Sequence, residues 1–263
     1  MTPATEHDVA AELEELSRQL EACGRCRLGE TRTRLVFGEG DPSADLMFVG
    51  EAPGYHEDKQ GRPFVGAAGK LLADLLETIG LSREQVYITN VLKSRPPNNR
   101  DPQPDEVEAC KPFLLMQIGL IQPRVVCTLG NFATKLLSGS PLGITRVHGQ
   151  PQVQEVGGHR FNLYPIFHPA AALYTPSMLE TLRAAFLRLP ELLRADAPGA
   201  ETRSSGQTEA PAGAATACEP QAVEEQAGVE EQAPLPLSAP APDDPPSAES
   251  QASPDPGEQL GLF

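Results

Sequence analysis

Three polar residues at the ends of short apolar runs supply the functional groups that a hydrolytic site needs. Glu51, Asn90 and His168 each lie near the end of such a run or directly after it. A carboxylate can hold or activate a water, an amide can donate and accept hydrogen bonds, and an imidazole can stabilise negative charge on a leaving group. If the fold brings these side chains together, they form one polar cleft.

The elements that would bring them together are strands that alternate with helices. The expected strands are residues 45–50, 86–91, 125–129 and 161–167, and the expected helices are residues 9–20, 66–79, 105–120, 131–137 and 177–193. This alternation predicts a three-layer α/β/α domain with a central four-stranded, mainly parallel sheet. Ligands bind such sheets at the carboxyl ends of the strands, where Glu51, Asn90 and His168 would meet.

Glycines and prolines crowd the connection after the first of these strands. Residues 50–54 are Gly-Glu-Ala-Pro-Gly, and residues 61–66 are Gly-Arg-Pro-Phe-Val-Gly. Glycine and proline force tight turns, and glycine lets the backbone approach a ligand closely. A plain strand-to-helix connection with solvated acidic residues is the alternative that the pattern alone leaves open.

The cysteines are spaced as metal or cluster ligands. Cys23 and Cys26 form a Cys-x2-Cys pair, and Cys110 lies far along the chain. We expect a cytoplasmic protein, because the N-terminus lacks the apolar stretch of a signal peptide and no run of about 18 apolar residues spans a membrane. In that reducing compartment, cysteines ligate metals more readily than they form disulfides. Zinc is one candidate, since it accepts widely spaced cysteines.

Composition divides the chain into two parts. The formal net charge is −15, and residues 195–263 hold 13 acidic residues and one basic residue. The preceding residues are close to neutral, so the overall acidity does not argue against DNA as a partner. The last part is rich in Pro, Ala, Glu, Gln and Ser, a composition that cannot bury enough apolar surface to order a chain. We therefore predict a catalytic domain over residues 1–194 and a disordered linker over residues 195–258.

Several segments in order along the chain carry a family resemblance. They are residues 50–54 with 57–58, 61–66 with 68–69, 89–91 with 95–100, 109–110 with 112–114, and 168–169. Together these segments are specific, and the sequence resembles the family 4 uracil-DNA glycosylases, the iron–sulfur branch of their superfamily. The resemblance implies an enzyme that flips uracil out of DNA and hydrolyses the bond between base and sugar. The abasic site that remains would initiate base excision repair.

The resemblance also implies roles for single residues. His168 donates a hydrogen bond to the departing uracil, and Phe64 stacks on the flipped base. Asn90 pairs with O4 and N3 of uracil, where cytosine presents the opposite pattern of donors and acceptors. A packed histidine, a core aromatic residue and a turn-capping asparagine are the respective alternatives. The implied catalytic residues are Glu51, Asn90 and His168, and the implied uracil-binding residues are Gly50, Glu51, Ala52, Glu57, Phe64, Asn90 and His168.

The group that positions the water is the least determined part of this site. Uracil glycosylases of other families place an Asp one position after Glu51, where this chain has Ala52. Glu51 or Glu57 must replace that Asp, or the reaction depends mainly on stabilisation of the leaving group. Glu57 is expected beside C5 of the base, where it would exclude the methyl group of thymine. A solvated loop acid is the alternative for both residues.

Three residues are implied to contact the DNA. Leu173 matches the position where relatives insert a wedge into the space left by the flipped base. Arg95 and Arg100 are candidates for phosphate contacts, with solvated loop charge as the alternative. No lysine is suitably placed to form a Schiff base, so the enzyme is expected to be monofunctional. We also expect it to be a monomer.

The implied cofactor is a 4Fe–4S cluster held by four thiolates, of which Cys23, Cys26 and Cys110 match. The remaining family cysteine falls at Ser94, whose oxygen is a weaker ligand. Cys127 is a possible substitute, although a buried strand cysteine is otherwise a small apolar residue. A three-iron or labile cluster is a further alternative. We expect a structural iron–sulfur cluster that departs from the family pattern at Ser94.

The last residues of the chain resemble the bacterial sliding-clamp binding peptide. In this interpretation Gln259 occupies a polar subsite, while Leu262 and Phe263 fill a hydrophobic pocket and Leu260 completes the motif. The preceding linker of about 60 residues would give a tether with an r.m.s. span of roughly 45 Å. A chance match over residues 259–263 is the alternative.

Other functions remain compatible with parts of this pattern. The same fold can act on another lesion, such as a deaminated purine. A non-catalytic DNA-binding or clamp-tethered adaptor and a redox sensor built on the irregular cluster are hypotheses from other classes. The set of Glu51, Asn90 and His168 favours an enzyme, and Asn90 with Glu57 favours uracil.

Overall fold

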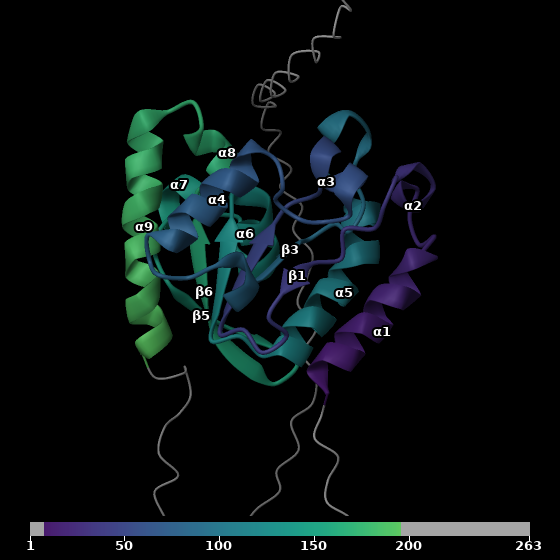
Figure 1. Cartoon of the computed structure of the whole chain (residues 1–263), viewed down its shortest axis with the longest axis horizontal. Helices are drawn as coiled ribbons and strands as arrows, with labels where there is room; N and C mark the ends of the chain where they lie inside the picture. The colour runs from purple at the N-terminus through teal and green to yellow at the C-terminus, as the bar shows by residue number, and fades with distance from the viewer. Residues whose placement is uncertain (1–7, 196–263) are drawn as a thin grey trace, which may run out of the picture. The chain divides into compact units, whose positions relative to one another are not determined.

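A six-stranded mixed sheet forms the centre of the computed structural model, which describes residues 8–195 (Figure 1). The strands are β1 (Glu39–Gly40), β2 (Leu46–Gly50), β3 (Tyr87–Asn90), β4 (Val125–Leu129), β5 (Gln152–Val156) and β6 (His159–Ile166). Their order across the sheet is β1-β3-β2-β4-β6-β5. The four inner strands run parallel, whereas β1 and β5 pair antiparallel with their neighbours.

The prediction of a four-stranded sheet is wrong, because it omits both edge strands. The strand β1 has only two residues, which is too short to produce an apolar pattern. Side chains of β5 alternate between half-buried and exposed, and the strand includes Gln152 and Gln154. In contrast, every residue of β2, β3 and β4 is buried. Inner strands covered on both faces therefore show in the sequence, while the polar edges do not.

Helices cover both faces of this sheet. The α-helices of the described part are α1 (Val9–Glu21), α2 (Leu28–Thr31), α3 (Tyr55–Gln60), α4 (Ala67–Glu77), α5 (Pro104–Ile121), α6 (Asn131–Ser138), α7 (Ile144–Val147), α8 (Pro169–Ala172) and α9 (Pro176–Arg194). Two short 3-10 helices are η1 (Arg83–Gln85) and η2 (Pro97–Asn99). The five predicted helices correspond to α1, α4, α5, α6 and α9, and the four short helices were not predicted.

Two apolar cores lie on opposite faces of the sheet. Met47 and Val49 of β2 pack in the core that includes α1 and α5. Their neighbours Leu46 and Phe48 pack in the core that includes α4 and α9, where the rings of Phe48 and Phe186 stack with centroids 5.7 Å apart. Successive side chains of a strand point to opposite faces, so one strand contributes to both cores. The result is the expected α/β/α layering.

The strand register places the functional loops at one edge. Gly50 pairs with Asn90 across β2 and β3, and Leu129 pairs with Ile166 across β4 and β6. These pairs are the last residues of their strands, so the loops after them all leave the sheet at its carboxyl edge. No helix in the described part is long and apolar enough to cross a membrane. The predicted linker after Ala195 and the peptide at residues 259–263 lie outside the described residues.

Candidate active site at the carboxyl edge

Asn90 carries a buried hydrogen-bond acceptor without a partner. Asn90 is 2% exposed. Among residues 8–195, its Oδ1 is the one buried side-chain polar atom that makes no hydrogen bond. A Cβ atom on the paired Gly50 would overlap Asn90 Oδ1 and lie 2.6 Å from Cζ of Phe64. Glycine at position 50 therefore lets the amide and the aromatic ring converge. Leaving such an acceptor unpaired costs free energy unless a ligand supplies a donor.

Phe64 is held in an unusual backbone conformation beside this amide. Its φ angle is 53°, in the left-handed region that bulky residues rarely adopt. Arg83 donates hydrogen bonds to the carbonyl oxygens of Phe64 and Pro63 at 2.9 and 2.7 Å. The backbone of Phe64 also passes so close to Gly69 that a Cβ there would overlap it. The surrounding structure thus fixes the ring, and such strain is typical of functional sites.

His168 faces the same ring from the end of β6. The two rings stack with centroids 5.6 Å apart. The backbone N–H of Ala170 donates a hydrogen bond to His168 Nδ1 at 3.1 Å. Burial lowers the pKa of His168 to about 4, and the negative charge of Glu57 opposes this shift. The imidazole is therefore neutral at pH 7, and its proton resides on Nε2.

Gly130, at the end of β4, allows the close approach of His168. Its φ angle is 89°, and a Cβ there would lie 3.2 Å from the Cβ of His168. The N–H of Gly130 also donates to the carbonyl oxygen of Ile166 at 2.9 Å. Sequence reasoning assigned no role to this glycine. Its position directly after a buried strand is the signal that would have identified it.

Glu57 organises the loop that carries Phe64. Its Oε1 accepts hydrogen bonds from the backbone N–H groups of Val65 and Gly66 at 2.9 and 3.0 Å. A Cβ on Gly54 would lie 2.8 Å from its Oε2, so the carboxylate is closely enclosed. The structure thus gives Glu57 a structural contact with the loop, and its negative charge opposes the lowering of the pKa of His168.

Glu51 lies half-buried at the start of the same loop. Burial raises the pKa of its carboxyl, and the negative charge of Asp101 raises it further. A carboxylate with a raised pKa is a stronger base at neutral pH. Ala52, the next residue, is half-buried and packs against the core on the α1 and α5 side.

A buried lysine that was not predicted from the sequence, Lys93, forms a hydrogen bond with the backbone of Asn90. Lys93 is 1% exposed, and its Nζ donates to Thr89 Oγ1, the carbonyl oxygen of Asn90 and Gln117 Oε1 at 2.6, 2.7 and 2.6 Å. Burial lowers the pKa of Lys93 to about 7, and the charge of Cys110 opposes the shift. The network fixes the backbone of Asn90. No local sequence pattern predicts that a lysine is buried in the core.

Three of the predicted thiols lie on one side of the sheet. Burial raises the pKa of Cys110, and the charges of Cys26 and Cys23 raise it further, while a backbone hydrogen bond at Lys93 opposes the shift. Cys110 is buried in the core that includes α1 and α5, and Cys23 and Cys26 pack against that same core. Cys127 is buried in the opposite core, and burial raises its pKa well above the usual value. The sheet separates it from the other thiols.

Ser94, the residue expected in place of the fourth cysteine, directly follows Lys93 in the chain. It is buried, and Arg32 Nη1 donates a hydrogen bond to its Oγ at 3.2 Å. The Nη2 atom of Arg32 donates to the carbonyl oxygens of Leu20 and Glu21 at 2.9 and 2.5 Å. Arg32 thus joins the end of α1 to the loop after β3. Within residues 8–195, no three His, Cys, Asp or Glu side chains lie close enough to hold a single metal ion.

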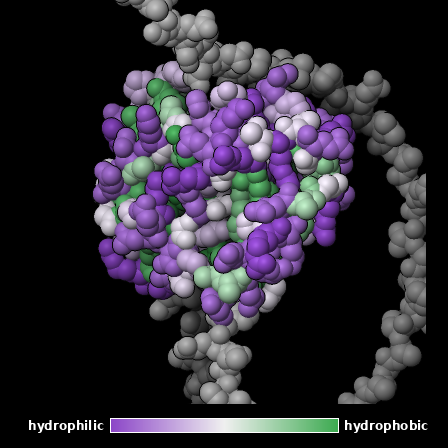
Figure 2. Space-filling model, turned by 45° about the vertical axis from the view of Figure 1, so that its right-hand side comes forward, coloured by the Kyte–Doolittle hydropathy of each residue, from purple (hydrophilic) through white to green (hydrophobic). Residues whose placement is uncertain are grey.

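The residues predicted to contact DNA lie in different environments. Arg100 donates to both carboxylate oxygens of the buried Glu106 at 2.9 and 2.5 Å. Arg95 is half-buried and donates to Asn99 Oδ1 at 2.7 Å. Leu173 is exposed beyond α8, beside Tyr174, which is 81% exposed. The face shown in Figure 2 is mostly hydrophilic, with small hydrophobic areas between the polar ones.

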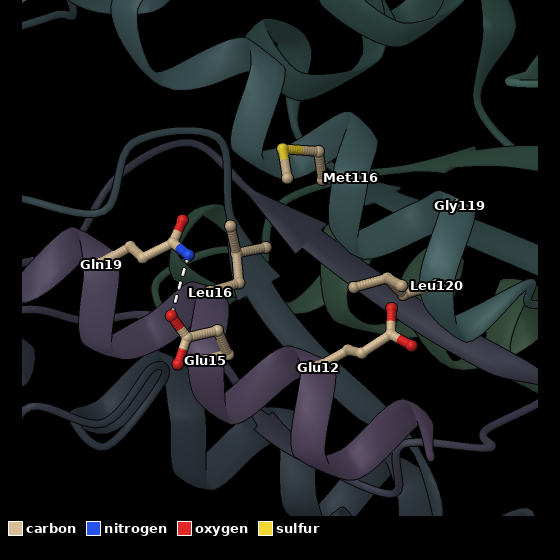
Figure 3. Close-up of a pocket in the computed structure, with 7 residues that line it drawn as sticks. All are labelled: Glu12, Glu15, Leu16, Gln19, Met116, Gly119 and Leu120. Carbon is tan, nitrogen blue, oxygen red and sulfur yellow. Dashed lines mark hydrogen bonds between the residues drawn. The ribbon is translucent and has the colours of Figure 1, made fainter. Parts of the chain in front are cut away.

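A separate hollow of about 390 Å³ lies between α1 and α5 (Figure 3). Its lining residues are Glu12, Glu15, Leu16, Gln19, Met116, Gly119 and Leu120. The α5 residues belong to the half of the helix that leads into β4, away from the carboxyl edge. None of the site residues described above lines this hollow, so it is not part of the candidate site.

Comparison with known proteins assigns the family. Residues 37–190 match the family described as the uracil DNA glycosylase superfamily. The chain is 48% identical over 186 residues to the type-4 uracil-DNA glycosylase of Sulfurisphaera tokodaii, covering 68% of this chain and 84% of that protein. It is 46% identical over 184 residues to the type-4 enzyme of Archaeoglobus fulgidus, covering 68% and 92%. It is also 37% identical over 119 residues to the type-5 enzyme of Thermus thermophilus, covering 40% and 54%. The chain belongs to the uracil DNA glycosylase superfamily.

Proposed function

We propose that this chain is a monofunctional uracil-DNA glycosylase, which hydrolyses the bond between uracil and deoxyribose and leaves an abasic site. The similarity to several type-4 uracil-DNA glycosylases supports the reaction. The single structural observation that carries the proposal is the unpaired, buried Oδ1 of Asn90. An extrahelical base is read by hydrogen bonds to its Watson–Crick edge and by stacking. The carboxyl edge offers both.

The proposed recognition of uracil depends on Asn90 and Phe64. The Oδ1 of Asn90 accepts a hydrogen bond from N3–H of uracil, and its amide group donates to O4. Cytosine carries an acceptor at N3 and a donor at C4, so it would oppose both groups. The ring of Phe64 supplies a fixed surface for stacking. Glu57 holds the loop of Phe64 at the edge where C5 of the base would lie, which supports its proposed role against thymine.

The proposed chemistry depends on stabilising the uracil anion as it leaves. The Nε2–H of neutral His168 donates a hydrogen bond to a uracil oxygen, which gains negative charge as the bond breaks. Glu51 holds or deprotonates the water that attacks the sugar carbon, and its raised pKa suits this role. The proton of that water passes to Glu51. Lys93 is buried and makes three hydrogen bonds, so it does not reach the sugar as a Schiff-base amine.

We propose that Cys23, Cys26 and Cys110 hold an iron–sulfur cluster, with Ser94 in place of the fourth thiolate. The fit is supported by the place of the three cysteines, since Cys23 and Cys26 pack against the core that contains Cys110. A cluster bound there supplies no step of the hydrolysis and acts structurally. It would tie the connection after α1 to α5.

We further propose the DNA contacts and the division of the chain. Leu173 would fill the space left by the flipped base, and Arg95 and Arg100 would meet phosphates, although Arg100 must do so while paired with Glu106. Residues 1–194 would form the catalytic domain and residues 195–258 a linker. Residues 259–263 would then bind a sliding clamp.

The reaction is tested with purified protein and labelled oligonucleotides that contain U:G, U:A, single-stranded U or T:G. Alkali then splits the abasic sites. We expect cleavage at uracil and not at thymine, and a fall in kcat of about 10²–10³-fold in Asn90→Ala. The matched control is Asn162→Ala, because Asn162 pairs with Val125 at the opposite end of the strands. Intact uracil in all wild-type reactions, from protein that is folded, would overturn the proposal.

A further inference from the structure

An exposed aromatic residue lies close to two cations at the carboxyl edge. Tyr55 is 51% exposed and begins α3. The guanidinium carbon of Arg95 lies 5.2 Å from the centre of its ring, and Nζ of Lys59 lies 5.8 Å from it. None of the roles described above uses Tyr55 or Lys59. An exposed aromatic ring with flanking cations combines the two features that bind single-stranded nucleic acid, a stacking surface and positive charge.

This Tyr55 cluster (Tyr55, Lys59 and Arg95) lies beside the residues proposed to bind uracil. Tyr55 is two residues from Glu57, which holds the loop of Phe64. Arg95 is five residues beyond Asn90 in the loop after β3. The contact between Tyr55 and Arg95 therefore joins the loops after β2 and β3, the two strands whose ends pair Gly50 with Asn90.

The cluster is held in place by the loop that carries Arg95. Arg95 Nε donates to Asn99 Oδ1 at 2.7 Å. Asn98 and Asn99 have φ angles of 55° and 52°, in the left-handed region. Asparagine tolerates this conformation better than other residues with side chains, but it persists only where the surroundings impose it. The guanidinium is thus presented by a constrained turn, so little conformational freedom is lost when a ligand binds.

We propose that the Tyr55 cluster is a second base-binding site, which stacks an unpaired base next to the flipped uracil. The ring of Tyr55 and the guanidinium of Arg95 provide the stacking surface, and Lys59 compensates the charge of the adjacent phosphate. The position of the uracil in this inference rests on the proposed function. The stacking itself does not, because every base has an aromatic face.

The ligand of this site is single-stranded rather than double-stranded DNA. In a duplex, each neighbour of the flipped nucleotide is paired and stacked, so capturing it would require a second flipping event, with further loss of pairing and stacking. In a single strand, the neighbour is free to rotate onto an exposed ring. The Tyr55 cluster therefore favours single-stranded substrates over paired ones.

The test measures binding of the full chain to a fluorescent, uracil-free single strand and to the same sequence as a duplex. Tyr55→Leu keeps apolar bulk but removes the aromatic face, and Tyr55→Phe keeps the face. We expect Tyr55→Leu to raise the Kd for the single strand by about 5- to 150-fold. Tyr55→Phe should bind as the wild type does, and neither variant should change the Kd for the duplex. Leu187→Ala on α9, where Leu187 is 62% exposed, controls for loss of an exposed apolar side chain.

Two further measurements separate stacking from charge and from the proposed function. Lys59→Gln should lower the slope of log Kd against log salt by about 0.7 for the single strand, whereas Tyr55→Leu should leave it unchanged. Equal single-strand affinities of wild type, Tyr55→Leu and Tyr55→Phe would overturn the proposal, even if Lys59→Gln binds weakly. Wild-type protein that binds the single strand through Tyr55 but removes no uracil would refute the proposed function and leave this site standing.

Discussion

The Nδ1 atom of His168 accepts a hydrogen bond from the backbone N–H of Ala170 at 3.1 Å. This bond leaves Nε2 as the only protonated nitrogen of the neutral ring, so the backbone of α8 selects the tautomer. A neutral imidazole donates a hydrogen bond to a developing anion without first having to lose or gain a proton. The consequence is a site whose leaving-group donor is ready over a wide pH range.

The first prediction concerns pH. Because burial lowers the pKa of His168 from 6.5 to about 4, we expect the single-turnover rate of uracil removal by Glu51→Gln to show no step near pH 6.5. The slower rate of this variant should fall only at lower pH, as His168 takes up a proton. The wild-type rate should also fall as Glu51 is protonated, since burial raises the pKa of that carboxyl. Half-loss of the Glu51→Gln rate at pH 6.5 would contradict the assignment of His168.

The free energy of unfolding should also decrease as the pH falls, because of the same lowered pKa of His168. The contribution of neutral His168 to the free energy of unfolding is complete above pH 6.5 and is lost as the pH falls from 6.5 towards 4, because the unfolded chain binds the proton first. Urea unfolding of wild type and His168→Asn across this range measures the difference, which should shrink as the pH falls.

The second prediction concerns Gly50. The Gly50→Ala change places a Cβ against Asn90 Oδ1 and within 2.6 Å of Phe64 Cζ, so the two groups must separate. A shift of this size should lower kcat/KM for uracil in single-stranded DNA by about 100-fold. Gly119→Ala is the matched control, because a Cβ on Gly119 meets nothing within 4 Å. Similar kcat/KM values for both variants would show that the close approach at Gly50 is not needed.

The third prediction concerns the cluster. Ser94→Cys restores a thiolate beside Cys110, although it removes the hydrogen bond from Arg32. Since a thiolate binds iron more strongly than a hydroxyl does, we expect the visible absorption of the cluster to bleach more slowly in air. Ser43→Cys, in the turn before β2, controls for an added thiol elsewhere. Equal bleaching rates for Ser94→Cys and wild type would remove Ser94 from the ligand set.

The fourth prediction concerns the C-terminal peptide. Deleting residues 259–263 should abolish binding to a bacterial sliding clamp, because Leu262 and Phe263 supply the apolar contacts of the proposed motif. Uracil removal from short oligonucleotides should be unchanged, since the residues proposed for catalysis lie within residues 8–195. Surface plasmon resonance with immobilised clamp measures the first effect. Undiminished clamp binding by the truncated protein would refute the peptide's role.

Local rules predict where some polar side chains lie relative to the sheet. Asn90 ends a buried strand and His168 follows another, and parallel strands bring their carboxyl ends to one edge, so the approach of both residues to Phe64 there follows from the sequence pattern. The strand β5 could not be predicted, because an edge strand with polar side chains lacks the apolar signal of an inner one. Local patterns therefore identify the strands that are buried on both faces and the polar residues directly after them.

The supporting contacts were not predictable, because they join residues far apart in the chain. Lys93 reaches Gln117 on α5, and Arg83 reaches the carbonyl oxygen of Phe64. Arg32 likewise meets Ser94 across the fold. Each depends on the completed packing of helices against the sheet, which no spacing in the sequence encodes. The sequence alone can therefore indicate the side chains proposed to bind and convert the substrate, but not the side chains that support them.

The unpaired oxygen of Asn90 lowers the stability of the folded protein, although it is proposed to be needed for binding uracil. In the empty protein this atom forgoes the hydrogen bonds that water offers it in the unfolded chain, at a cost of about 1–3 kcal/mol. A leucine of similar size would remove that cost, so Asn90→Leu should melt at a higher temperature and excise nothing. In the proposed complex, N3–H of uracil would donate to this oxygen and remove the same deficit. Bound uracil would then complete the hydrogen bonding around Asn90, and the protein would be more stable with its substrate than without it.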